Sequence, residues 1–301
     1  MSCLDPPLYT SRISALFPVW AGSNDRNTTM QQFGYKIMKK NLAEEMPVVH
    51  AAIAQQRPLE VGLYTGDSEI LDFIGATLRE AAHPIPVNTH FNHYHSTLFE
   101  LGSQEEQLHQ QFADARALGS DYSVTHVHKW PVSLRPAFRE TLAEHLTRQL
   151  LLLERFCAEY DHPVHIENTF HPLAFYQWLF ALVERLELRY IRCCFDIGHA
   201  KIWSQESLPQ WLQWLHELEG KGVRLHFHLH ANNGLADQHL AFVESESLGL
   251  NRADDYIQAG DYFVAIARLH QQFPDSRKVF EVKPVLALEN MTLVMGRLEI
   301  V

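Results

Sequence analysis

Short apolar segments alternate with longer amphipathic segments along the chain. The short segments have the length of strands, and the longer ones carry apolar residues at helical spacing or are rich in leucine. Regular alternation of the two kinds is typical of an α/β fold rather than of separate all-α and all-β parts. The eight predicted strands are 13–19, 59–64, 86–91, 121–127, 163–168, 190–196, 223–230 and 278–282.

The predicted helices lie between these strands. The plainest is 134–160, with the sequence LRPAFRETLAEHLTRQLLLLERFCAEY. We predict no helix after Pro284, because the remaining segment is short. The other predicted helices lie near 28–55, 67–82, 104–118, 171–187, 207–219 and 254–273.

Side chains of the metal-binding type end six of the predicted strands. They are separated by about one strand-helix unit, which takes roughly thirty residues in a (β/α)8 barrel of ~250 residues. The carboxyl ends of barrel strands meet at one rim, where active sites lie. The spacing therefore predicts a (β/α)8 TIM barrel whose rim gathers these side chains. They are His90, His126, Glu167, Asp196 with His199, the run of His226, His228 and His230, and Glu281.

Length and composition agree with one barrel. The chain has 301 residues, of which 46% are hydrophobic, enough to bury one large core. No low-complexity segment, linker or block of like charges marks a second domain. We therefore predict a single domain over 1–301.

Charge and cysteine usage narrow the classes of function. The formal net charge of -11 disfavours sequence-independent binding of nucleic acid, which rests on Lys and Arg. The N-terminus has charged and proline residues before any long apolar run, and no stretch is long enough to span a membrane, so we predict neither export nor membrane insertion. Cys3, Cys157, Cys193 and Cys194 lack zinc-ribbon or CxxC spacing, and we interpret them as reduced thiols of a cytoplasmic protein.

Two strand ends carry carboxylates. Glu167, in HIENTF, follows an apolar strand, so its carboxylate can point into the barrel mouth and bind a divalent metal. An acidic helix cap is the alternative. In RCCFDIGHAKIW, Asp196 and His199 flank a glycine that lets the chain turn sharply. They suit one shared site or two neighbouring ones.

The seventh strand carries three histidines on one face. In LHFHLHANNGLADQHL, His226, His228 and His230 alternate with apolar residues, so their side chains project from the same side. An exposed histidine cluster without a ligand is the alternative. Downstream, Asp237 and His239 form a D-x-H pair whose spacing lets both reach one ion.

The last strand ends in KVFEVKP. Glu281 and Lys283 share a face at the barrel mouth. A structural pair between the two is the alternative to a role in the site.

Taken together, the motifs at the strand ends resemble those of a known superfamily. The strings ENTF, FDIGHA, HLHANNG followed by D-Q-H, and FEVKP look like the xylose isomerase-like TIM barrels. This superfamily holds sugar-phosphate isomerases and epimerases and the apurinic endonucleases. The motifs cover nearly the whole chain, in the family's order and spacing, and are poor indicators of substrate.

The resemblance implies a site for one divalent metal ion. His228 matches the family's histidine if HLHAN stands for the common H-L-x-D-N, which puts Ala231 where an aspartate is usual; His230 is the alternative. The metal would be manganese, zinc, cobalt or iron. Its implied ligands are Glu167, Asp196, His228 and Glu281.

The endonuclease branch of the superfamily implies further ions. His90 and His126 match that branch's histidines at the ends of the third and fourth strands. His199, Asp237 and His239 match its remaining metal site. The resemblance therefore implies ligands for up to three ions.

We first predict a metal-dependent isomerase or epimerase acting on a small sugar, sugar phosphate or polyol. The ion would hold adjacent carbonyl and hydroxyl oxygens and stabilise an enediolate, with Glu167 and Glu281 as base and acid. A multi-metal zinc phosphoesterase or apurinic endonuclease is the first alternative, although the acidic composition counts against a DNA-repair enzyme. A non-catalytic barrel that binds metal or a small molecule is the second. The expected partner is a small carbohydrate and not nucleic acid.

Four further residues are candidates for substrate binding. Lys283 would neutralise a phosphate or carboxylate, or pair with Glu281. A place in the core is the first interpretation of Trp130 and of Trp203, and a wall of the pocket against a sugar face is the alternative. Glu60, in LEVGLYTGD, resembles a family glutamate that ends the second strand.

Overall fold

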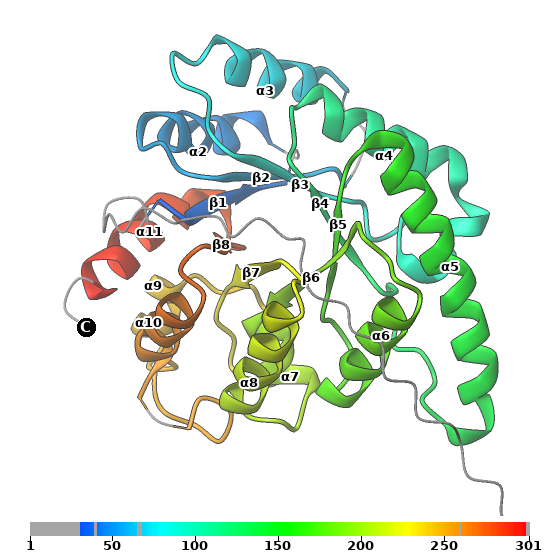
Figure 1. Cartoon of the computed structure of the whole chain (residues 1–301). Coiled ribbons are helices and arrows are strands. Elements are labelled where there is room, and N and C mark those ends of the chain that lie inside the picture. Colours follow the sequence, from blue (N-terminus) through cyan, green and yellow to red (C-terminus); the bar gives the residue numbers. More distant parts are fainter. Residues whose placement is uncertain (1–30, 39–40, 65–67, 259, 299–301) are drawn as a thin grey trace, which may run out of the picture.

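Eight parallel strands close into one barrel in chain order, with β1 hydrogen-bonded to β8 (Figure 1). The computed structural model describes residues 31–38, 41–64, 68–258 and 260–298. The predicted (β/α)8 TIM barrel is therefore confirmed. Its strands are β1 (Phe33–Ile37), β2 (Leu59–Gly62), β3 (Val87–His90), β4 (Ser123–His126), β5 (Val164–Glu167), β6 (Ile191–Asp196), β7 (Leu225–Leu229) and β8 (Arg277–Phe280).

Helices surround the barrel and connect successive strands (Figure 1). Two short 3-10 helices, η1 (Leu98–Ser103) and η2 (Pro136–Phe138), precede α4 and α5. The α-helices are α2 (Leu42–Ala54), α3 (Ser68–Glu80), α4 (Glu105–Ala117), α5 (Arg139–Tyr160), α6 (Leu173–Arg185), α7 (Ile197–Trp203), α8 (Leu208–Gly220), α9 (Phe242–Ser247), α10 (Tyr262–Gln272) and α11 (Pro284–Leu298).

The first strand differs from the prediction. The segment 13–19 lies outside the described residues, and β1 falls inside the segment that we predicted as the helix 28–55. The error has a physical cause, because Lys36 interrupts the apolar pattern of FGYKI and yet is only 1% exposed. Its ammonium lies 3.1 Å from Glu60 Oε1 on β2, so the charge is compensated by a carboxylate far away in the sequence.

The helix predictions need correction at two places. α11 forms after Pro284, where we predicted none, because Ala287, Met291 and Val294 give it a buried face. The predicted helix 254–273 is shorter at its start, since α10 begins only after Asp261, whose side chain accepts a hydrogen bond from the Val264 N–H.

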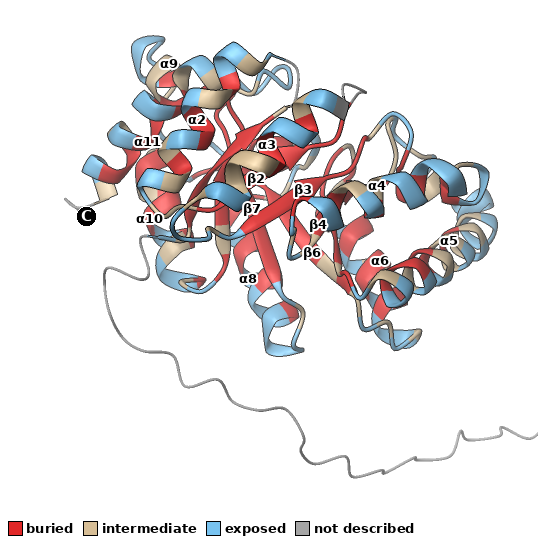
Figure 2. Cartoon of the chain, turned by 90° about the horizontal axis from the view of Figure 1, so that it is seen from above, coloured by how far each residue is buried: buried red, intermediate tan, exposed pale blue. Residues whose placement is uncertain are grey.

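The two faces of the barrel strands differ in character. Buried residues concentrate on the strands and on the inward sides of the helices (Figure 2). Residues facing the helices, such as Tyr35, Val61 and Phe227, belong to one hydrophobic core. Alternate residues point into the barrel, where Lys36 and His228 meet carboxylates from other strands. The barrel interior is therefore largely polar.

Two of the remaining expectations concern cysteines and membranes. Of the four cysteines, Cys157, Cys193 and Cys194 are described, and all three are buried and free of disulfides. Cys3 lies outside the described residues. Among the helices that the structure describes, none has the length and apolar character needed to cross a membrane.

Candidate metal centre

The candidate ligands lie at the carboxyl ends of neighbouring strands. β3, β4, β5 and β6 end at His90, His126, Glu167 and Asp196, respectively. The strand register pairs His126 with Glu167 and Asp196 with His228. Hydrogen-bonded pairing therefore brings side chains that are far apart in the sequence to the same level of the barrel.

Glu167 occupies the centre of this arrangement and is fully buried. Its Oε2 lies 3.0 Å from His90 Nε2 and 3.1 Å from His126 Nε2. Its Oε1 lies 3.1 Å from His199 Nδ1 and 3.3 Å from His228 Nδ1. Both oxygens of one carboxylate thus face imidazoles from four different elements.

Among the described residues, four groups of side chains have the composition and proximity of metal ligands. One of them is Cys194, His226 and His228, and the other three contain the predicted ligands. In each group the ligand atoms lie within 4.8 Å of one another. The first group is Glu167, Asp196, His228 and Glu281; the second is His90, His126 and Glu167; the third is His199, His230, Asp237 and His239.

The first group fits a cation because lone pairs converge in it. Nε2 of His228 contacts Glu60, to which it donates, so an ion at Nδ1 would take the place of the proton that the surrounding charges favour there. That Nδ1 lies 2.9 Å from Glu281 Oε2 and 3.3 Å from Glu167 Oε1, and none of these three buried atoms makes a directed hydrogen bond with the described residues. Ligands of one zinc-like ion also lie about 3 Å apart, since each is about 2.0–2.2 Å from the ion.

Three histidines of the other two groups follow the same rule. His90, His199 and His239 each place Nδ1 near a backbone carbonyl oxygen, at 2.8, 2.9 and 3.3 Å, respectively. With Nδ1 as the donor, Nε2 is left with a lone pair that faces a carboxylate oxygen. Metal-bound histidines are held in this way, with the distant nitrogen donating to a carbonyl or carboxylate.

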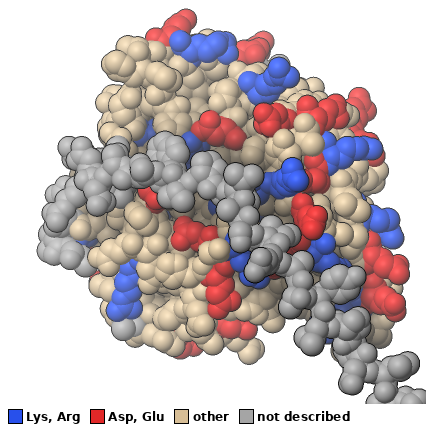
Figure 3. All heavy atoms as spheres, in the orientation of Figure 1, with Lys and Arg blue, Asp and Glu red and all other residues tan. Residues whose placement is uncertain are grey.

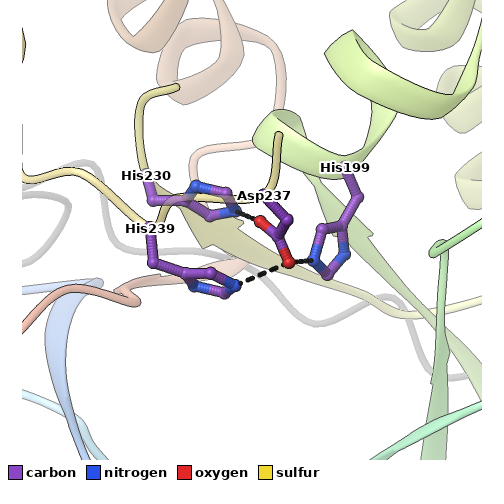
Figure 4. A group of neighbouring side chains, drawn as sticks. All are labelled: His199, His230, Asp237 and His239. Carbon is purple, nitrogen blue, oxygen red and sulfur yellow. Dashed lines mark hydrogen bonds and ion pairs between the residues drawn. The ribbon is translucent and has the colours of Figure 1, made fainter. Parts of the chain in front are cut away.

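The third group lies partly on a loop. His199 comes from α7 and His230 follows β7, while Asp237 and His239 come from the loop after it (Figure 4). Asp237 Oδ2 lies 3.2 Å from His199 Nε2 and 3.0 Å from His239 Nε2. Figure 4 shows the carboxylate of Asp237 pointing between the imidazoles.

The electrostatics keep the carboxylates ionised. Burial by itself raises the pKa of Glu167, but the charges of His228 and His126 hold that pKa well below its usual range. Burial likewise opposes ionisation of Glu281, and Lys36 and His228 reverse it and hold its pKa well below the usual value. Burial lowers the pKa of His90 to about 4, so this imidazole is neutral at pH 7. Anionic carboxylates and neutral imidazoles are the forms that bind metals.

A cavity of about 540 Å³ opens above the ligands. Its floor includes Lys36, Tyr64, His126, His199 and Glu281, and its wall includes Asp237 and His239. Its rim carries Tyr94, Lys129, Trp130, Phe170 and Lys283. A metal site at the bottom of a pocket of this size has room for a small organic substrate.

Of three comparisons with known proteins, only the comparison with solved structures found matches. No protein-family model and no curated protein sequence matches the chain. Among solved structures, the TTHB071 protein from Thermus thermophilus, soaked with ZnCl2, aligns at 20% identity with a TM-score of 0.60, over 88% of this chain and 98% of that one. A D-tagatose 3-epimerase-like protein aligns at 16% identity with a TM-score of 0.60, over 89% and 97%.

A third solved structure is 3-keto-D-glucoside 4-epimerase, YcjR, from E. coli. It aligns at 12% identity with a TM-score of 0.58, over 90% of this chain and 99% of that one. This chain shares its TIM-barrel fold with these proteins and with solved structures titled as xylose isomerase domain proteins, as the motifs predicted. At these identities the likeness concerns the fold, and the reaction has to be argued from the site.

Glu60, a predicted substrate contact, lies in β2 and points into the barrel. It is fully buried and is not among the residues that line the cavity. Its carboxylate instead contacts Lys36, Asn88, His226 and His228. Glu60 therefore holds the ligand His228 in place.

Lys283 and the tryptophans also differ in part from expectation. Lys283 lines the cavity, but its partner is Glu244 at 3.0 Å, and Glu281 pairs with Lys36 at 2.6 Å. Trp130 is 65% exposed at the rim, so its interpretation as a core residue is wrong. Trp203 does not line the cavity and packs edge-on against Phe170, which does.

Sequence reasoning missed Lys36 and the aromatic rim. Lys36 was missed because β1 was predicted as a helix. Tyr64 and Tyr94 were missed because a tyrosine after a strand carries no signal of its direction. The polar residue between two apolar ones in FGYKI is the one feature from which a strand with an inward lysine could have been inferred.

Proposed function

We propose that the protein is a divalent-metal-dependent hydrolase of small phosphoesters, with a centre that holds more than one ion. The observation that carries the proposal is the shared carboxylate of Glu167. Its Oε1 contacts His228 of the first group, and its Oε2 contacts His90 and His126 of the second group. A carboxylate that bridges two ligand groups is typical of multinuclear sites, and many of these act on phosphoesters.

The residues of the three groups would hold the ions. Glu167, Asp196, His228 and Glu281 would hold one, and His90, His126 and Glu167 a second. The mixed nitrogen and oxygen ligands suit zinc, manganese, cobalt or iron. Bound ions of this kind supply Lewis-acid stabilisation of charge on the phosphoryl oxygens and activate water as a nucleophile.

The chain's own side chains would bind and orient the substrate. Lys36 lines the floor of the cavity, where its ammonium pairs with Glu281 and would add positive charge near a phosphoryl oxygen. Trp130, Tyr94 and Phe170 at the rim offer flat apolar surfaces that suit a sugar face. These features support a small phosphorylated sugar or polyol as the substrate class.

The acidic balance supports a small substrate rather than DNA. On the face seen in Figure 3, acidic and basic side chains are interspersed, without a continuous basic tract among the residues drawn in colour. At the mouth, Lys129 and Lys283 are paired with Glu100 and Glu244. Binding of a DNA backbone needs a basic groove. A cytoplasmic location remains part of this proposal.

A metal-dependent isomerase or epimerase of a small sugar is the second candidate. It is favoured by the group of Glu167, Asp196, His228 and Glu281, which could hold a single ion, with Glu167 and Glu281 as base and acid. Solved structures of this fold include proteins named as epimerases. We rank it second because the contacts of both Glu167 oxygens with imidazoles leave that carboxylate poorly placed to take up a proton.

One pair of measurements tests the two candidates. The metal content of the purified protein would be measured by elemental analysis, and the protein would then be incubated in D2O with sugars and with sugar phosphates. Two or three ions per chain and release of inorganic phosphate would support the hydrolase. One ion per chain and deuterium incorporation at a substrate carbon, without phosphate release, would overturn it in favour of the isomerase.

A further inference from the structure

The third ligand group offers four protein ligands to one ion: His199, His230, Asp237 and His239. We infer that it forms a closed metal site that fixes the loop 232–239 to the barrel, with no position left for substrate. The inference deepens the proposed function, since it divides the metal centre into an open catalytic part and a structural part. The residue that decides it is His230.

His230 is fully buried and lacks a directed partner. Its Nε2 makes no directed hydrogen bond with the described residues, and its Nδ1 lies 3.3 Å from the Ala231 carbonyl oxygen. Its ring stacks on His239 at 4.1 Å between centroids and 13° between planes. Nε2 lies 3.9 Å from Asp237 Oδ1, on the side where the other ligands converge (Figure 4).

Gly198 makes room for this imidazole. A Cβ atom at position 198 would lie 2.1 Å from His230 Cε1 and 2.5 Å from Nε2, too close for any side chain unless the ring moves. Gly198 belongs to α7, which also supplies His199. The Gly198 carbonyl accepts a hydrogen bond from Asn232 Nδ2 at 2.9 Å, which ties the start of the loop to the same helix. The backbone is therefore shaped around His230.

Four ligands complete a tetrahedral site. Three imidazole nitrogens and one carboxylate oxygen would surround the ion, and structural zinc sites are four-coordinate and closed in this way. Catalytic sites keep an open position. The group of His90, His126 and Glu167 has only three protein ligands, and it shares Glu167 with the group of Asp196, His228 and Glu281. Because Glu167 is shared, neither of these two groups has four ligands of its own, and His126 and Glu281 line the cavity, which suits a catalytic centre.

The loop itself has few other anchors. Its base is closed by paired backbone hydrogen bonds between Ala231 and Leu240, at 2.8 and 2.9 Å. Within it Leu235 is 85% exposed, and His239 adopts a left-handed φ of 47°, which is unfavourable for a residue other than glycine. Asp237 and His239 also line the cavity, so an ion held here would fix one wall of the substrate pocket.

A different role for His230 is testable. Its Nε2 lies 3.0 Å from Asp196 Oδ1, so His230 could instead support Asp196, a ligand of the first group. That oxygen already accepts the His199 N–H at 2.6 Å, which caps α7. The two roles predict the loss of different ions when His230 is changed.

The experiment compares four variants with the unchanged protein. They are His230→Gln, His239→Gln, Glu281→Gln and, as a control on the surface of α8, His216→Gln. Each is loaded with zinc or with cobalt(II) and dialysed against a weak chelator. Ions per chain, the visible spectrum of the cobalt form and the rate of proteolytic cleavage near Leu235 are then measured, none of which depends on turnover.

We expect His230→Gln to behave like His239→Gln. Both should lose one ion, with affinity for it reduced by about 10- to 100-fold, together with the intense visible absorption typical of four-coordinate cobalt(II). Both should be cleaved faster near Leu235, whereas His216→Gln should not change. Retention of every ion by His230→Gln, or a loss that matches Glu281→Gln, would overturn the inference.

A second variant, Gly198→Ala, tests the inference in case His230→Gln does not fold. Gly198→Ala should displace the His230 ring and remove the same ion, and adding His230→Gln to it should cause no further loss. Independent losses in the double variant would contradict the inference. If the unchanged protein shows the closed site but releases no phosphate from sugar phosphates, the hydrolase proposal fails while the structural site stands.

Discussion

The candidate ligands fall into two regions that are held in different ways. Glu167, Asp196 and His228 sit on strands of the closed barrel and are fully buried. Asp237 and His239 sit on the loop 232–239, where their side chains are 33% and 32% exposed. Hydrogen-bonded register positions the first set before any ion binds, while the second set has little besides its ligand contacts to hold it.

The difference shows how one barrel can combine rigidity and adaptability. Strand-borne ligands are pre-organised, so binding an ion there costs little conformational entropy. Loop-borne ligands lose more freedom, and an ion bound to them orders a wall of the pocket. We therefore expect substitutions on the strands to abolish chemistry and substitutions on the loop to alter it.

The largest effect is expected for Glu167→Gln. It removes a ligand shared by two groups and should lower phosphoester hydrolysis by more than about 100-fold, since loss of even an indirect metal partner costs about 10- to 100-fold. The far-ultraviolet circular dichroism should not change. His239→Gln, on the loop, should lose less activity. An equal loss of hydrolytic activity in the two variants would contradict the expected difference between ligands on strands and ligands on the loop.

Lys36→Met should strongly destabilise the metal-free protein. Lys36 lies 2.6 Å from Glu281 Oε1 and 3.1 Å from Glu60 Oε1, and its removal leaves two buried carboxylates uncompensated. Breaking a buried pair costs about 3–5 kcal/mol. In urea unfolding, the substitution should lower the free energy of unfolding less when ions are bound, because the ions compensate the same carboxylates. A loss that is the same with and without metal would show that Lys36 acts independently of the ligands.

His162 provides a comparison with a buried histidine outside the ligand groups. It lies 2.8 Å from Ser123 Oγ, and burial lowers its pKa from 6.5 to about 4. The unfolded chain therefore takes up a proton between these values while the folded chain does not, so stability is present above pH 6.5 and lost as the pH falls toward 4. The loss should be up to about 3 kcal/mol. His162→Asn should flatten this part of a pH series of urea unfolding curves in metal-free protein.

The smallest effect is expected at the rim. Trp130→Ala removes an exposed flat surface that touches neither the ligand groups nor the core. It should raise KM for a sugar phosphate a few-fold, as expected for loss of one contact worth about 1 kcal/mol, and leave kcat unchanged. A fall in kcat with constant KM would place Trp130 closer to the reacting atoms than the cavity suggests.

The sequence by itself determined the (β/α)8 fold, most strands and the set of candidate ligands. Periodicity sufficed because apolar alternation is a local property, and FDIGHA and HLHANNG mark strand ends within the same segments that form them. It failed at β1, where the interior charge of Lys36 is stable only because Glu60 and Glu281 face it from other strands.

Only the tertiary structure decided how the ligands group. Closure of the barrel brings His90, His126 and His228 around one carboxylate, which no spacing along the chain could show. It also placed Glu60 in the barrel interior, in contact with Lys36 and His228. The physical reason is that both depend on distances across the barrel, and these are set by strand register and closure rather than by neighbouring residues.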